Sequence, residues 1–148
     1  MLTTSEQATV LEAREILRRF ISDKPILSSY ASVIDYLAFG AAGAKREVFR
    51  VLFLDRRNRL IEDWEAGTGT ISFVAVYPRE IIAKALELSS SAIILSHNHP
   101  SGDPAPSAAD VEMTKKIIEA SNVFEITVHD HIIVGADGDY SMRANGQI

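Results

Sequence analysis

Hydrophobic positions recur at helical spacing near the start of the chain, which predicts a helix within residues 1–24. The apolar residues that fall on one face of this helix are Val10, Leu11, Ile16, Leu17 and Phe20. Pro25 marks the break after it. A second, short helix is predicted over residues 32–39, with Ser32 as its cap and Gly40 at its end.

From residue 47 onward the pattern changes to short runs rich in β-branched and aromatic residues, which predict strands. Strands are expected over residues 47–55, 59–67, 71–77, 92–96 and 139–142, and one or two more over 125–135. The first two enclose a turn and predict a hairpin. Helices are expected over residues 78–89 and 107–120. Helices before and between strands predict an α/β fold, a three-layer α/β/α arrangement with a central mixed sheet.

Composition and charge narrow the kinds of site that this chain can contain. There is no cysteine, so any metal ion must be held by His, Asp or Glu. The net charge of −5 argues against a large phosphate-binding surface, because affinity for nucleic acid comes mostly from Lys and Arg. The chain shows neither an apolar run of about 20 residues nor a signal peptide. We therefore expect a soluble cytoplasmic protein that has no contact with the membrane.

Two histidines follow directly after the apolar run at residues 92–96. In extended backbone, positions i and i+2 point to the same side, so His97 and His99 aim their imidazoles at one point. Ligand crevices form at the carboxyl ends of strands in open α/β sheets. Two imidazoles and one carboxylate make the ligand set of a catalytic zinc, which leaves one position for water. The sequence therefore predicts a metal site here.

The third ligand has two candidates in the sequence. Asp110 lies in the first turn of the next predicted helix, whereas Asp103 lies in a Gly-Asp-Pro turn, where Asp is common for local reasons. Ser107 and Asp110 also form the S-x-x-D pattern of a capping box, so Asp110 has a purely local alternative role. A capping acid needs only nearby backbone N–H groups, whereas a ligand must face the histidines.

Other polar and aromatic residues have more than one interpretation. Asn98 would orient the loop through its amide. His129 and His131 share a strand face and suggest either a second metal site or a buried, hydrogen-bonded His131 beside the first one. Trp64 is expected in the core or at an edge of the sheet, and the turn at residues 55–57 could line a substrate groove.

The spacing of these residues resembles the JAMM motif of MPN+/JAB-domain metalloproteases. That motif is H-x-H, seven residues, Ser, two residues and Asp, with an upstream Glu, here Glu47. The surrounding sequence is closer still to the bacterial RadC family. The segments that carry the resemblance are "EVFRVLFLDRRN" at 47–58, "YPRE" at 77–80, "SHNHPSGDPAPSAAD" at 96–110 and "DHIIVG" at 130–135. The likeness covers about residues 25–148.

The resemblance implies a cytidine-deaminase-like fold and a role for each motif residue. His97, His99 and Asp110 would bind one zinc ion per chain, although manganese or iron would also suit these ligands. Glu47 would hold the attacking water and act as general base, and Ser107 would donate a hydrogen bond to the oxyanion. Asn98 and His131 are not part of this motif and are candidates, from their positions alone, for contact with the metal ligands or with the substrate.

The resemblance further implies a zinc-dependent hydrolase that cleaves peptide or isopeptide amide bonds in a protein or peptide substrate. A non-enzymatic JAB-type scaffold and a metal-dependent nuclease stay open as alternatives. Longer RadC-like chains carry a helix-hairpin-helix DNA-binding region, the origin of the family's DNA-repair label. Residues 1–24 lack its glycine hairpins, so we expect no DNA binding. The expected organisation is a helical extension over 1–24 and a JAB/MPN+ domain over 25–148, with the oligomeric state left open.

Overall fold

The computed structural model of the chain describes residues 3–22, 30–41, 44–68 and 75–148. Its helices are α1 (Thr4–Ser22), α2 (Tyr30–Ala41), α3 (Pro78–Glu87) and α4 (Ala108–Val123). Its strands are β1 (Val48–Leu54), β2 (Leu60–Thr68), β3 (Ala92–Asn98), β4 (Thr127–Gly135) and β5 (Gly138–Ser141). Most of the predicted elements therefore form, close to their predicted bounds.

The strands form one mixed sheet in the order β2-β1-β3-β4-β5. β1 runs antiparallel to both β2 and β3, and β4 runs parallel to β3 and antiparallel to β5. Parallel neighbours need a crossover connection, and α4 supplies it between β3 and β4. In the β1–β3 ladder Phe49 pairs with His97. The start of β1 therefore lies beside the carboxyl end of β3, where the two motif histidines follow.

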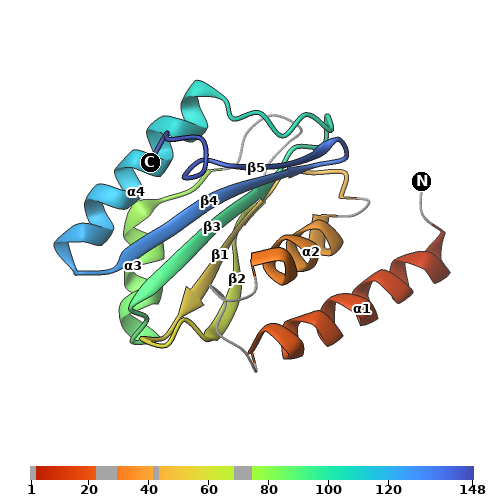
Figure 1. Cartoon of the computed structure of the whole chain (residues 1–148), viewed down its shortest axis with the longest axis horizontal. Coiled ribbons are helices and arrows are strands. Elements are labelled where there is room, and N and C mark those ends of the chain that lie inside the picture. Colours follow the sequence, from red (N-terminus) through yellow and green to blue (C-terminus); the bar gives the residue numbers. More distant parts are fainter. Residues whose placement is uncertain (1–2, 23–29, 42–43, 69–74) are drawn as a thin grey trace.

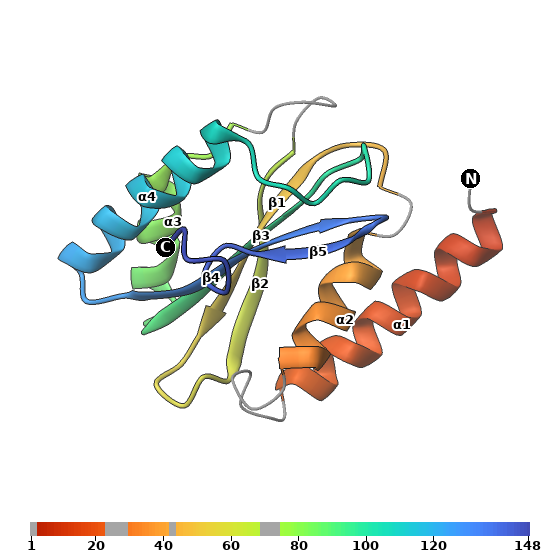
Figure 2. The same ribbon diagram turned by 45° about the horizontal axis from the view of Figure 1, so that its top comes forward.

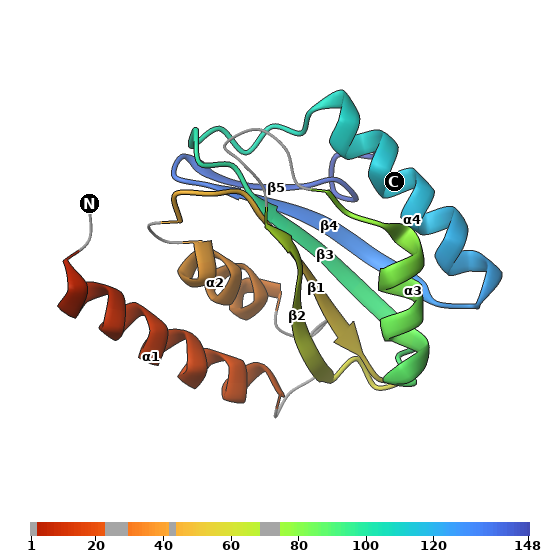
Figure 3. The same ribbon diagram turned by 180° about the vertical axis from the view of Figure 1, so that it is seen from behind.

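The sheet lies between two helical layers (Figures 1 and 3). Helices α3 and α4 cover one face, and α2 covers the other with α1 packed beside it. Side chains of β3 alternate between the two layers: Ile93 and Leu95 join the core cluster under α3 and α4, whereas Ile94 joins the cluster under α2. The predicted three-layer α/β/α fold with a central mixed sheet is confirmed.

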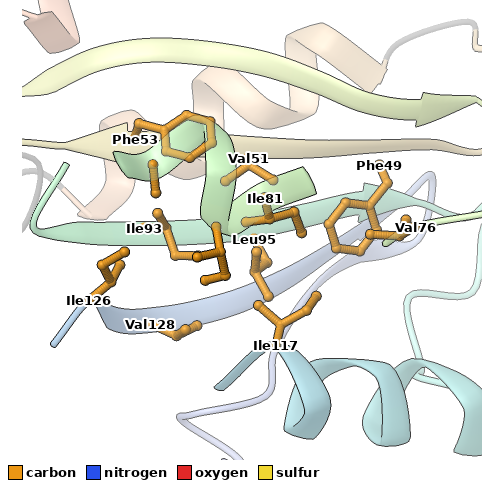
Figure 4. Close-up of a cluster of buried hydrophobic side chains, with 12 residues drawn as sticks. Phe49, Val51, Phe53, Val76, Ile81, Ile93, Leu95, Ile117, Ile126 and Val128 are labelled. Atoms are coloured by element: carbon orange, nitrogen blue, oxygen red, sulfur yellow. The ribbon is translucent and has the colours of Figure 1, made fainter. Parts of the chain in front are cut away.

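Helix α4 is anchored to the sheet by apolar packing (Figure 4). Ile117 of α4 and Ile81 of α3 pack with Val51 of β1 and Leu95 of β3, and all four side chains are fully buried. Burying one such side chain contributes about 1.5–3 kcal/mol. Since α4 begins directly after the histidine loop, this packing fixes where its first turn stands relative to β3.

Helix α1 is joined to the sheet through a buried polar cluster. Asp63 of β2 accepts bonds from Arg50 Nε at 3.0 Å and Arg50 Nη2 at 2.6 Å, and from Arg14 Nη2 of α1 at 3.4 Å. The hydroxyl of Tyr36 on α2 donates to the same carboxylate. A buried carboxylate needs such partners to offset its lost hydration.

Among the described helices, none carries an apolar stretch long enough to cross a membrane.

Some predicted elements differ from the structure. The strand expected over 71–77 falls largely outside the described residues, and residues 75–77 form irregular backbone that leads into α3. Helix α2 already begins at Tyr30, so Ser32 lies within the helix and is not its cap. Residues 127–135 form a single strand, β4. Helix–coil boundaries of this kind depend on tertiary packing, which periodicity does not record.

Candidate metal centre

His97 and His99 stand where β3 ends. His97 is the sixth residue of the strand, and His99 follows its last residue. The backbone N–H of His99 still donates to Val134 of β4 at 2.9 Å, so the extended course continues past the strand. Both rings therefore point to the α4 side, with their Nε2 atoms 3.0 Å apart. Phe49 stacks on His97, with ring centroids 6.0 Å apart and planes at 8°.

The loop after β3 folds over the ends of β3, β4 and β5 (Figure 2). The backbone N–H of Gly102 donates to His99 at 3.0 Å, and the carbonyl of Gly102 accepts from Asp137 at 3.1 Å. Gly102 has a φ of 98°, a conformation that favours glycine. His99 Nδ1 lies 2.9 Å from the carbonyl oxygen of Asp103. Because a carbonyl only accepts, Nδ1 carries a hydrogen, and Nε2 is the bare nitrogen when the ring is neutral.

Close backbone contact between Gly102 and Gly135 holds this loop against β4. A Cβ atom at Gly135 would lie 2.0 Å from the carbonyl oxygen of Gly102. We expect Gly135→Ala to lower the free energy of unfolding in urea by about 3 kcal/mol, the upper part of the usual overpacking range.

The matched control for this change is Gly146→Ala. Gly146 has a φ of 71° and no heavy atom within 4 Å of an added Cβ, so only the backbone penalty applies. That penalty is about 1–2 kcal/mol. Equal losses of stability in the two variants would contradict a clamping role for the Gly102–Gly135 contact.

Asp110 takes part in the capping box and also faces the histidines. Its Oδ2 accepts from the backbone N–H and the hydroxyl of Ser107, both at 2.7 Å, and Ser107 Oγ accepts from the Asp110 N–H at 3.1 Å. Its Oδ1 lies 3.5 Å from His97 Nε2, and Oδ2 lies 3.6 Å from His99 Nε2. The two roles that the sequence left as alternatives are therefore geometrically compatible, because a carboxylate has two oxygens.

Electrostatics at Asp110 favour the ionised carboxylate. Burial raises its pKa, but the adjacent His97 ring and the two hydrogen bonds that Ser107 donates outweigh burial. The net result is a pKa well below the ordinary value of 3.8. Asp110 is therefore an anion at neutral pH, as a metal ligand must be.

The donor set fits a metal ion. One ligand atom each from Glu47, His97, His99 and Asp110 lies within 4.8 Å of the others. A tetrahedral zinc with bonds of about 2.0–2.1 Å would separate its ligand atoms by about 3.3 Å. The separations of 3.0, 3.5 and 3.6 Å among the two Nε2 atoms and the Asp110 carboxylate lie around that value.

Glu47 joins the group from the neighbouring strand. It precedes β1, and the antiparallel register that pairs Phe49 with His97 brings it alongside the histidine pair. Burial raises the pKa of Glu47, and the neighbouring His97 and His99 oppose that rise only in part. A carboxylate with a raised pKa is a stronger base than an exposed one.

Asn98 fixes the backbone on both sides of Glu47. Its Oδ1 accepts from the backbone N–H of Val48 at 2.8 Å, and its Nδ2 donates to the carbonyl of Arg46 at 3.0 Å. The side-chain amide thus takes the place of a strand partner. The predicted loop-orienting role of Asn98 corresponds in the structure to a link between the histidine loop and the segment that carries Glu47.

Several sequence candidates lie elsewhere. The carboxylate of Asp103 accepts from the N–H of Ala105 at 2.9 Å in a local turn, and within the described residues it is not part of the ligand cluster. Trp64 packs against the core, as expected. Asp55 and the turn after it lie at the other end of β1 from Glu47, so they do not line this centre.

His129 and His131 do not form a second site. His129 Nε2 bonds Asn58 Oδ1 at 2.7 Å in the β1–β2 turn, whereas His131 is buried and its Nε2 lies 2.8 Å from His97 Nδ1. A bulge opposite Ile93 and Ile94 interrupts the ladder at His129. Burial, with a further contribution from His97, lowers the pKa of His131 well below 6.5, so it is neutral. The alternative of a hydrogen-bonded histidine beside the first site is the one that the structure contains.

A cavity of about 90 Å³ lies on the α2 side of the sheet, and His97 is among its lining residues. Its polar lining includes Arg14, Arg50, Ser96 and Asn98. A water molecule occupies roughly 30 Å³, so this volume holds a few waters and no peptide. The ligand cluster on the α4 side is therefore the candidate centre for chemistry.

Comparison with known families agrees with this geometry. A family model described as a RadC-like JAB domain matches residues 27–147, which include the whole ligand cluster and leave α1 outside. This match, the mixed sheet between helical layers and the possible metal site together indicate a fold of the metal-dependent hydrolase type. The chain belongs to the family of RadC-like JAB domains.

Proposed function

We propose that this protein is a zinc-dependent hydrolase that cleaves a peptide or isopeptide amide bond. The observation that carries the proposal is the convergence of Glu47, His97, His99 and Asp110 within 4.8 Å. The two histidines and Asp110 would hold the ion, and Glu47 would act beside it. When bound, zinc would polarise the scissile carbonyl and lower the pKa of water toward about 7.

Glu47 is the proposed general base. Its carboxylate takes a proton from the attacking water and then delivers that proton to the amide nitrogen, which must be protonated to leave as an amine. Its buried position and raised pKa support this role, because a base with a higher pKa accepts the proton more readily. Asn98 holds the backbone on both sides of this residue in place through two hydrogen bonds of its side-chain amide.

Ser107 is the proposed donor to the developing oxyanion. Its hydroxyl donates to Asp110 Oδ2 at 2.7 Å, at the rim of the ligand cluster. In the proposed reaction the hydroxyl hydrogen turns about the Cβ–Oγ bond and is donated to the carbonyl oxygen. A donor of this kind typically accelerates acyl transfer by about 10²–10³.

The test combines metal content with hydrolysis. Protein purified without chelator or affinity tag is expected to contain about one zinc per chain by mass spectrometry, as three protein ligands predict. It is expected to cleave members of a panel of peptides and lysine isopeptides. Chelation should abolish cleavage, and zinc should restore it, with manganese and iron as alternative ions.

The outcomes separate three classes of protein. Full metal occupancy without cleavage of any amide would overturn the hydrolase proposal and favour a JAB-type scaffold. Steep salt dependence in a DNA titration at low salt, together with strand cleavage, would favour a nuclease.

A further inference from the structure

Residues outside the ligand cluster contact Nδ1 of His97, the ring nitrogen that does not face the cluster. His97 Nδ1 lies 2.8 Å from His131 Nε2, and His131 Nδ1 lies 2.6 Å from the hydroxyl of Thr114. That hydroxyl lies 2.6 Å from the carbonyl oxygen of Asp110, one helical turn earlier in α4. These contacts join His97 of β3 to His131 of β4 and then to Thr114 of α4. The last of them ends on Asp110, which belongs to the ligand cluster.

The direction of each hydrogen bond follows from the last acceptor. A carbonyl oxygen only accepts, so the Thr114 hydroxyl gives its single hydrogen to Asp110. The hydroxyl oxygen must then accept from His131, which places the ring hydrogen of His131 on Nδ1. A neutral imidazole carries one N–H, so His131 Nε2 accepts from His97 Nδ1. His97 Nε2 is left without a hydrogen, and this atom faces His99 and Asp110.

Burial makes this arrangement rigid. Thr114 is 0% exposed and His131 is 1% exposed, so water cannot replace either partner. Phe49 also packs its ring edge-on to His131, at a centroid distance of 5.3 Å. Because the Thr114 bond ends on the backbone of Asp110, the same contacts also tie the first turn of α4 to the ring of His97.

We propose that Thr114 and His131 are positioning residues that fix His97 in the tautomer whose bare Nε2 binds the metal ion. The inference rests on the proposed metal site and extends it to residues that touch no substrate. A histidine ligand whose other nitrogen donates to a fixed acceptor binds metal more tightly, and loss of that acceptor typically costs about 10–100-fold in affinity.

The experiment compares zinc affinity in Thr114→Val and wild type by competition with a chromophoric chelator. Valine keeps the shape of threonine but offers no acceptor to His131, so we expect affinity to fall by about 10–100-fold. Thr114→Ser restores the hydroxyl and should bind zinc with close to wild-type affinity. Thr9→Val is the matched control, because the Thr9 hydroxyl also bonds the carbonyl four residues earlier, at 3.1 Å, but on the exposed helix α1.

A second measurement uses wild-type protein alone and does not depend on the folding of a variant. Nitrogen–proton correlation spectra of the histidine rings should show the hydrogen on Nδ1 in both His97 and His131. A His131 protonated on Nε2 would overturn the inference. Wild type that binds zinc tightly, with Thr114→Val binding it equally well, would overturn the inference and leave the proposed function standing. Wild type that binds no metal would overturn both.

Discussion

Asp110→Asn is expected to leave helix α4 folded and to abolish zinc binding. An asparagine side-chain oxygen can still accept both bonds from Ser107, so the capping box is retained. The change removes the negative charge that lies 3.5 Å from His97 and 3.6 Å from His99. We expect zinc affinity to fall by more than about a hundredfold. Loss of a residue that only hydrogen-bonds a metal ligand already lowers metal affinity by about 10–100-fold. Metal content by mass spectrometry and helicity by circular dichroism measure the two effects separately.

Ser107→Ala is the complementary variant. It removes both hydroxyl contacts of the capping box but leaves the Asp110 carboxylate in place. We expect it to keep its zinc and to lose about 1 kcal/mol of stability, the usual cost of a lost cap. If Asp110→Asn kept its zinc, Asp110 would be a cap alone and the third ligand would have to be another residue.

The pH dependence of stability in the metal-free protein reports on the same Asp110 carboxylate. The pKa of Asp110 in the folded state lies well below its ordinary value of 3.8. A depressed carboxyl pKa contributes stability above the unfolded pKa, and this contribution is lost as the pH falls through the folded value. Part of the acid sensitivity of the protein therefore comes from the carboxylate that faces the two histidines.

Local patterns were sufficient to predict the parts of the site that depend on one strand. The i and i+2 rule holds for any extended segment, so it brought His97 and His99 together whatever the rest of the fold. The buried apolar run at 92–96 and the hairpin at residues 47–67 were predictable for the same reason: their periodicity reports burial directly.

Long-range contacts were not predictable from local patterns. The partners of Asn98 lie about 50 residues earlier, at Arg46 and Val48, and no feature of "HNH" indicates them. Thr114 was missed altogether, although its spacing of four from Asp110 places it on the same helix face. Its other partner, His131, comes from β4, past a bulge that periodicity does not reveal. Placing Glu47 beside the histidines from the sequence required the family resemblance.

The choice between cap and ligand at Asp110 shows a different limit of sequence reasoning. Capping and ligation were set against each other because each uses the same side chain. In the structure, Oδ2 takes both bonds from Ser107 while Oδ1 faces His97. The capping box thus holds the carboxylate in the orientation that ligation needs, so one motif serves local folding and the candidate site together.

Glu47→Gln is expected to lower kcat by about 10²–10⁴, the usual contribution of a general base, while zinc content stays unchanged. Glutamine has the shape of glutamate but cannot accept a proton from water at neutral pH. The two histidines and Asp110 are untouched, so metal affinity should stay close to that of wild type. The measurement is steady-state hydrolysis of an amide substrate found with the panel, with metal content determined on the same sample.

The matched control is Glu112→Gln, because Glu112 forms an exposed ion pair with Lys116 on α4. That change should alter neither turnover nor metal content. Equal turnover in Glu47→Gln and wild type would rule out Glu47 as the base.

The thermal stability of the Glu47→Gln variant gives an independent test of the role of Glu47. Burial raises the pKa of Glu47 above 4.5, which means that the folded state disfavours its ionised form. For a carboxyl with a raised folded pKa, the ionised group lowers stability at neutral pH. In the metal-free protein, Glu47→Gln should therefore unfold at an equal or higher temperature than wild type, whereas a residue kept for folding would show the opposite. A variant that is at least as stable without metal, binds zinc as wild type does and has lost hydrolysis would mark Glu47 as a residue whose charge is retained for chemistry at a cost to stability.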